Sequence, residues 1–216
     1  MVACCGHEAP KFDGATRAFR RALWLVIAIN AAMFAVEMIA GAAAGSQALL
    51  ADALDFASDT ATYALSLAVL GMALVWRARA ALLKGLSLSL MGVGVLGLTA
   101  WQALVLDTPP QAELMGIVGF VALAANLASV LILLKFRDGD ANVRSVWLCS
   151  RNDAIGNVAV IAASGAVWLT ASAWPDLIVA ALMAGLFVRS SVSILRQAAG
   201  EMRHAGHADA HGHAGE

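Results

Sequence analysis

The chain has 216 residues, of which 61% are hydrophobic and only 13% charged, a balance that cannot cover a soluble domain with solvated groups. A formal net charge of −1 gives no electrostatic reason to expect nucleic acid as a partner. The 6% of aromatic residues are also too few for a base-stacking platform. Composition therefore indicates a protein whose main solvent is the lipid bilayer.

Residues 1–19 form the first predicted segment, which lacks the apolar stretch of a secretory signal. We therefore expect this segment to stay uncleaved and cytoplasmic. The three cysteines of the chain, two adjacent and one in an apolar stretch, cannot form a disulfide framework and suit a reducing compartment.

Residues 20–197 form the predicted transport domain, with six apolar stretches that can each cross the bilayer as a helix of about 20 residues. The predicted helices cover residues 22–41, 48–75, 82–106, 112–134, 143–171 and 175–195. Every second connection is basic, and the connections between those contain no Lys or Arg. The positive-inside bias therefore places both termini in the cytoplasm. The predicted fold is an all-α membrane protein with six transmembrane helices.

Residues 198–216 follow the sixth predicted helix and are rich in Ala, Gly and His. They are too few to bury a core, so we expect a disordered cytoplasmic tail. Soft metal donors gather in both terminal segments, where they either capture cytosolic metal or are incidental to solvated tails. These donors are Cys4, Cys5, His7, His204, His207, His211 and His213.

The second predicted helix carries Asp52, Asp55 and Asp59 at spacings of three and four, which stack on one helical face. An ionisable group in the bilayer core costs several kcal/mol unless it is paired or faces a polar cavity. Three neighbouring carboxylates also repel one another. They are therefore expected to hold a cation or a proton, although hydrogen bonding between packed helices is the alternative.

The fifth predicted helix places Cys149, Asp153 and Asn157 at successive spacings of four, again on one face. Cys149 and Asp153 together with Asp55 and Asp59 of the second helix give four donors, the coordination number that Zn²⁺ favours. A thiolate favours Zn²⁺ or Cd²⁺ over Mn²⁺ or Mg²⁺, while three carboxylates leave Co²⁺, Fe²⁺ and Ni²⁺ open. For the cysteine, the alternative is an inert, buried thiol. The predicted metal ligands are Asp55, Asp59, Cys149 and Asp153.

Other polar residues of the helices have supporting roles in this prediction. Asp52, one turn nearer the outer end, is expected to start the helix or to act behind the ligands. Asn157 is expected to act behind the ligands or to line the cavity. Asn30 and Glu37 share one face of the first helix, and Glu37 either lines the cavity or is paired internally. Asn126 of the fourth helix is expected to make an interhelical hydrogen bond.

Three stretches of the sequence resemble the cation diffusion facilitator family. They are GSQALLADALDFASD in the second helix, DAIGNVAVIAA in the fifth and WPDLIVAALMAGLFVRSSVSIL in the sixth. The resemblance spans roughly residues 20–197, and it implies a transport site at the same four residues. The family usually has His where Cys149 stands.

Family members commonly carry a cytoplasmic ferredoxin-like domain after the sixth helix, and the sequence ends before that position. We therefore expect a short member that lacks the domain and forms any homodimer through its transmembrane helices.

The predicted function is export of a divalent metal across a bacterial inner membrane in exchange for protons, by alternating access to the intramembrane site. The metal is cargo, and no permanently bound cofactor is expected. The protein would thus be a secondary active transporter and not an enzyme. One alternative is a metal-binding sensor or channel without coupled transport. Another is an intramembrane hydrolase that uses paired aspartates. The lack of an HExxH zinc-protease motif argues against a hydrolase.

Overall fold

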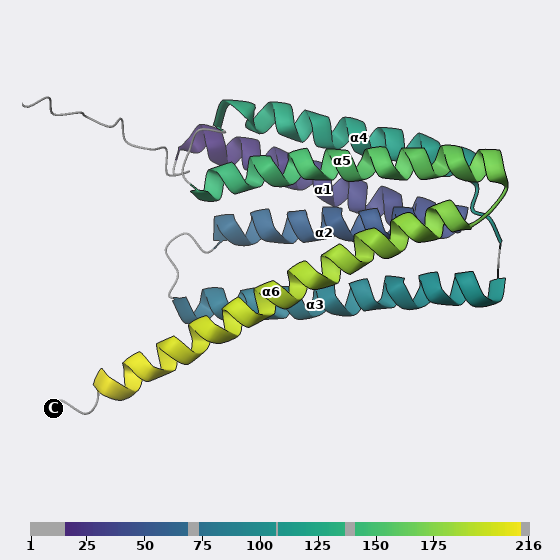
Figure 1. The fold of residues 1–216 in the computed structure, drawn as a ribbon. Helices are drawn as coiled ribbons and strands as arrows, with labels where there is room; N and C mark the ends of the chain where they lie inside the picture. The colour runs from purple at the N-terminus through teal and green to yellow at the C-terminus, as the bar shows by residue number, and fades with distance from the viewer. Residues whose placement is uncertain (1–15, 69–73, 107, 137–140, 213–216) are drawn as a thin grey trace, which may run out of the picture.

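The computed structural model describes residues 16–68, 74–106, 108–136 and 141–212, and these ranges are helical with short turns (Figure 1). The prediction of an all-α membrane protein with six helices is confirmed for this part of the chain. A π-helical turn, η1 (Gln102–Leu106), continues the third helix, and a 3₁₀ turn, η2 (Leu134–Phe136), continues the fourth. The helices are α1 (Arg17–Ala44), α2 (Gln47–Ala68), α3 (Leu74–Trp101), α4 (Ala112–Leu133), α5 (Ala141–Thr170) and α6 (Trp174–Gly212).

Short-range signals in the sequence fix the α1–α2 hairpin. The Thr16 hydroxyl caps α1 by accepting a hydrogen bond from the Phe19 N–H at 3.3 Å. α1 ends at Gly45, whose φ of 69° is a left-handed conformation that glycine adopts without steric penalty. The next residue, Ser46, accepts a hydrogen bond from the Leu49 N–H at 3.1 Å and so caps α2. The chain therefore reverses direction within a few residues.

Gly41 lets α1 approach α2 closely. A Cβ atom at this position would lie 3.0 Å from Leu50 Cδ2 and 3.2 Å from Leu49 Cβ. The last turn of α1 and the first turn of α2 are therefore in direct contact.

The helices form two groups that meet at α2. The most extensive contacts join α3 to α6, α4 to α5 and α1 to α2. α1 also packs on α4, which gathers α1, α2, α4 and α5 into one group, and α3 and α6 form the other. α2 lies between the groups and contacts α1, α3, α5 and α6 (Figure 1). Side chains in the central turns of α2 are thus surrounded by other helices.

Large apolar side chains cover the outside of the molecule, as a lipid-facing surface requires. Leu104, Leu169 and Ile39 are 85%, 77% and 73% exposed. By length and composition, four described helical stretches can cross a membrane: Arg17–Ala44, Gly85–Leu106, Ala112–Phe136 and Asp153–Thr170. α2 is not among them, since any membrane-length stretch of it contains all three aspartates.

The connections between helices alternate between the two ends of the molecule. The connections α1–α2, η1–α4 and α5–α6 lie at one end, and the start of α1 lies at the other (Figure 1). Which end faces the cytoplasm stays a prediction. α6 continues to Gly212, so residues 198–212 are helical here, whereas the sequence predicts a disordered tail.

The glycines of α3 face different surroundings. A Cβ at Gly92 would lie 2.9 Å from Val188 Cγ2 of α6, whereas a Cβ at Gly94 or Gly97 would meet nothing within 4 Å. The small residue at Gly92 therefore serves packing within this chain. Dimerisation through transmembrane helices stays a prediction.

Candidate metal site

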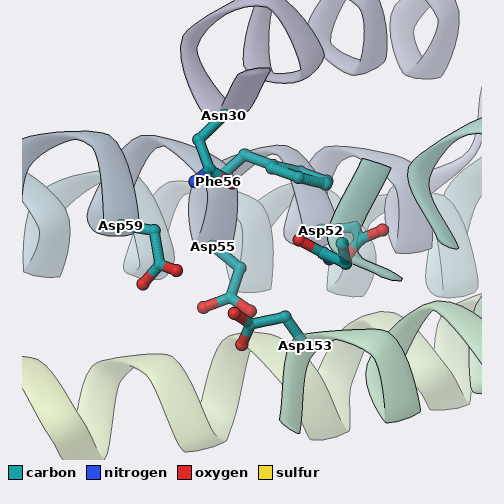
Figure 2. A pocket seen from close by; sticks show the side chains of 7 residues that line it. Asn30, Asp52, Asp55, Phe56, Asp59 and Asp153 are labelled. Atoms are coloured by element: carbon teal, nitrogen blue, oxygen red, sulfur yellow. The ribbon is translucent and has the colours of Figure 1, made fainter. Parts of the chain in front are cut away.

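One small pocket is lined by acidic and amide side chains from four helices (Figure 2). The side chains pack so closely that they leave no room for a water molecule between them. Four aspartates, two asparagines and one aromatic ring line it. These residues are Asn30 of α1, Asp52, Asp55, Phe56 and Asp59 of α2, Asn126 of α4 and Asp153 of α5.

The three aspartates of α2 follow one another along the pocket, as their spacing predicts (Figure 2). Asp52 and Asp59 are buried, with 1% and 7% of their surface exposed, and Asp55 between them is half-buried. A helix turns by 100° per residue, so these spacings keep all three within one side of α2. Helical geometry alone is sufficient to bring these carboxyl groups together.

Asp153 of α5 meets this row from the opposite side. Figure 2 shows its carboxyl group and that of Asp55 pointing toward each other. Asp59 is the second acidic neighbour of Asp153. Neither of two facing carboxylates can donate a hydrogen bond, so the arrangement is stable with a shared proton or with a cation between the groups. The fold thus creates a place for positive charge between α2 and α5.

Asp59 has a partner that the sequence analysis missed. The Tyr63 hydroxyl donates a hydrogen bond to Asp59 Oδ2. Tyr63 is 1% exposed and packs with Leu23 and Val26 of α1. The spacing of four between Asp59 and Tyr63 on one helix was the available signal, because such residues are neighbours on a helical face.

A chain of amides links α4 and α5 to α2. Asn126 Nδ2 donates to Asn157 Oδ1 at 2.8 Å. Asn157 Nδ2 in turn donates to Asp52 Oδ2 at 2.5 Å. All three side chains are at most 2% exposed. The predicted interhelical hydrogen bond of Asn126 is confirmed, and its partner is Asn157.

The two polar residues of α1 lie in different places. Asn30 lines the pocket, and its amide donates to the Val26 carbonyl of its own helix at 3.0 Å. Glu37 is fully buried and faces Asp52. Neither of its carboxyl oxygens has a hydrogen-bond donor among the described residues. Glu37 is not among the residues that line the pocket, and its role stays a prediction.

The full set of four metal donors stays a prediction. In the part of the chain that the structure describes, no three His, Cys, Asp or Glu side chains form a group that could hold a metal ion. Position 149 lies in α5 four residues before Asp153, but its side chain lies outside the described residues. The same holds for the side chains of the terminal donors, namely Cys4, Cys5, His7, His204, His207, His211 and His213.

Asp176, in the first turn of α6, has a structural role that the sequence analysis did not assign. Its carboxylate accepts hydrogen bonds from the Ser46 hydroxyl at 2.6 Å, the Gln47 N–H at 2.8 Å and the Ala48 N–H at 3.1 Å. These two N–H groups belong to the start of α2, where no intrahelical acceptor exists. A carboxylate there is also favoured by the helix dipole. Asp176 therefore holds the start of α6 against the start of α2.

Comparison with known proteins decides the family. A model of the cation efflux transmembrane domain matches residues 23–202, which include α2 to α5 and most of α1 and α6. The chain belongs to the cation efflux family. It is accordingly a multi-pass integral membrane protein, and the resemblance found in the sequence is confirmed.

Two relatives within the cation efflux family bear on what this member does. The metal cation efflux system protein CzcD of Cupriavidus metallidurans is 30% identical over 186 residues, which cover 81% of this chain and 58% of that protein. The cation efflux system protein CzcD of an Alcaligenes species is 30% identical over 179 residues, which cover 78% of this chain and 56% of that protein. The chain thus spans just over half the length of these curated relatives.

Proposed function

We propose that this protein exports divalent metal cations from the cytoplasm in exchange for protons, through a site formed by Asp55, Asp59, Asp153 and Cys149. The observation that carries the proposal is the meeting of buried and half-buried aspartates from α2 and α5 within a cation efflux domain. The relatives named as cation efflux proteins support the same activity.

The donor set favours Zn²⁺ or Cd²⁺ as cargo. Carboxylate oxygens accept many divalent cations, and the Cys149 thiolate adds a preference for softer ones. Co²⁺, Fe²⁺ and Ni²⁺ bind more weakly to such a mixed set under this proposal. The metal is transported cargo and is not a resident cofactor.

Proton exchange follows from the chemistry of the same ligands. Carboxylate and thiolate bind metal only when they are deprotonated, so protons compete directly with the metal ion. A more acidic outer side therefore promotes metal release there, and the protonated carrier returns its protons to the cytoplasm. Alternating access requires one group of helices to move against another, and the division into α1, α2, α4, α5 and the α3–α6 pair suits such a movement.

Zinc uptake by proteoliposomes with an acidic lumen and a trapped zinc indicator tests the proposal. We expect the pH gradient to accelerate uptake by the wild-type protein. Asp55→Ala and Asp153→Ala should reduce this uptake at least about tenfold, since even the loss of a group behind the ligands weakens metal sites about 10- to 100-fold. Glu113→Ala, which removes an exposed carboxyl group at the start of α4, is the matched control and should transport like the wild type.

Two results would contradict the proposal. Zinc movement that ignores the pH gradient would identify a channel without coupled transport. Unchanged uptake in both aspartate variants would remove these residues from the metal site.

A further inference from the structure

Glu37 is a buried acid that the proposed metal site does not use. It lies two turns before the end of α1 with 0% of its surface exposed, and neither carboxyl oxygen has a donor among the described residues. A buried carboxylate is unfavourable without a hydrogen-bond donor, a cation or a proton. What neutralises Glu37 must therefore be found in its surroundings.

The α1–α2 hairpin places Glu37 opposite Asp52. One turn earlier on α1, Met33 belongs to the same apolar cluster as Phe56 of α2. One turn later, Gly41 touches Leu49. On α1, position 37 lies midway between Met33 and Gly41. On α2, position 52 lies about midway between Leu49 and Phe56. The two carboxyl groups accordingly face each other within hydrogen-bonding range.

No described basic group compensates this pair. The six Lys and Arg side chains that the structure describes are all exposed. The titratable groups that face Glu37 are Asp52 and Asp55, both acidic. α5 and α4 contribute the neutral amides of Asn157 and Asn126 to this region, and Asp153 of α5, which is also acidic, lines the same pocket as Asp52. A proton is the simplest positive charge that fits between two carboxyl groups in contact.

The amide chain determines which carboxyl group accepts. Asn157 donates to Asp52 at 2.5 Å, and its own oxygen is occupied by Asn126 at 2.8 Å. A carboxylate that receives an N–H donor is stabilised in its charged form. Glu37 receives no such donor, so the proton belongs on Glu37, from which it can be donated to Asp52.

We propose that Glu37 and Asp52 form an intramembrane proton-binding site, separate from the metal ligands, in which protonated Glu37 donates a hydrogen bond to the Asp52 carboxylate. The coupling of this site to transport rests on the proposed function. A divalent cation at Asp55, one turn from Asp52, repels a proton at Glu37 strongly because the surroundings have a low dielectric constant. Metal binding thus expels the proton: the O–H bond of Glu37 breaks, the electron pair stays on the Glu37 carboxylate, and the proton is released to bulk water.

Infrared spectroscopy of the full-length protein in nanodiscs tests the site, with Glu37→Gln as the main variant. Gln keeps an N–H donor toward Asp52 and similar volume but has no carboxyl group. We expect the wild type at neutral pH to show the C=O band of a protonated carboxylic acid, and Glu37→Gln to lose part of it. The control Glu113→Gln should retain the whole band. Circular dichroism and gel filtration verify that each variant is folded.

A second measurement follows the same band on addition of Zn²⁺, with binding measured in parallel by calorimetry. The Glu37 part of the band should decrease as Zn²⁺ binds to the wild type, and Glu37→Gln should release about one proton fewer per metal ion. A band unchanged by Glu37→Gln overturns the proton site, and a Glu37 band that Zn²⁺ binding leaves unchanged overturns its coupling to metal. Wild-type protein that binds no metal would instead contradict the proposed function, and the metal-free comparison would still decide the role of Glu37.

Discussion

Each buried acidic side chain of this membrane protein is stabilised in its own way. A tyrosine hydroxyl donates to Asp59, an asparagine amide donates to Asp52, and a hydroxyl with two backbone N–H groups donates to Asp176. Asp153 faces another aspartate, and Glu37 has no described donor. Acids with donors can remain charged inside the bilayer, whereas the others require a proton or a cation. Each of the two proposed sites therefore joins an acid that has such a donor, Asp59 or Asp52, to an acid that faces another carboxyl group, Asp153 or Glu37.

Cys149 is the residue at which we expect metal preference to be determined. Cys149→His replaces a soft thiolate with a harder imidazole, which should shift transport several-fold from Cd²⁺ toward Zn²⁺. Metal-resolved uptake by proteoliposomes measures this ratio. A double variant with Cys4 and Cys5 changed to Ala controls for the N-terminal thiols and should keep the wild-type ratio. An unchanged ratio in Cys149→His would show that the thiol is inert.

The sequence predicted which residues share a helical face and that the acidic faces of the second and fifth helices meet, but not the other contacts between helices. The spacing of Asp52, Asp55 and Asp59 is a property of one helix, so it could be read without a structure. Asn126 was expected to bond to another helix, and its partner Asn157 emerged only from the packing of α4 on α5. The pairing of Glu37 with Asp52 likewise depends on the position of the α1–α2 turn. Partners across helices are tertiary information that periodicity does not contain.

At the level of helices, the hydrogen bonds that Asp176 of α6 accepts from the start of α2 are the strongest polar link between the two helix groups in the described part of the chain. Asp176 supplies acceptors for a hydroxyl and two backbone N–H groups at the start of α2. A helix start normally takes such acceptors from its own cap residue. Here a different helix provides them, so the link positions α2, which carries the aspartates of the candidate site.

Asp176→Ala should therefore destabilise the protein. Loss of a helix cap costs about 0.5–2 kcal/mol, and buried donors left without acceptors cost about 1–3 kcal/mol. We therefore expect the free energy of unfolding to decrease by about 2 kcal/mol. Thermal unfolding in detergent measures the change. Ser46→Ala, which removes one donor and keeps the carboxylate, should cost less, and Glu113→Ala should cost almost nothing. A melting temperature of Asp176→Ala equal to that of the wild type would show that the link contributes nothing.

The helices themselves were largely predictable, although their ends were not. Apolar length predicted all six, because a bilayer allows few alternatives to a helix of membrane length. α1 begins five residues before the predicted position at Arg17, and α6 extends well past residue 195. Polar residues at helix ends carry no hydrophobic signal, and this explains the errors. The hydrogen bonds between Asp176 and the start of α2 were missed because they join residues that are far apart in the sequence, such as Ser46 and Asp176.

For the whole molecule, the orientation in the membrane is the main prediction left to test. The basic connections and both termini should face the cytoplasm. In a variant with all three cysteines replaced, Thr108→Cys should react with an impermeant maleimide added to intact cells. Lys135→Cys, at the other end of the helices, should react only after permeabilisation. Both positions are exposed, and the reverse labelling pattern would invert the topology.

α6 can act as a lever, because it is fixed at one end and long. It is held to α2 near its first residue and crosses the other helices obliquely (Figure 1). At 1.5 Å per residue, the helix extends about 55 Å from Asp176 to its end at Gly212. A tilt of about 5° around the fixed point would move that end by about 5 Å while the carboxyl groups of α2 stay in place. Small rearrangements beside the candidate site would thus be amplified at the opposite end of the molecule.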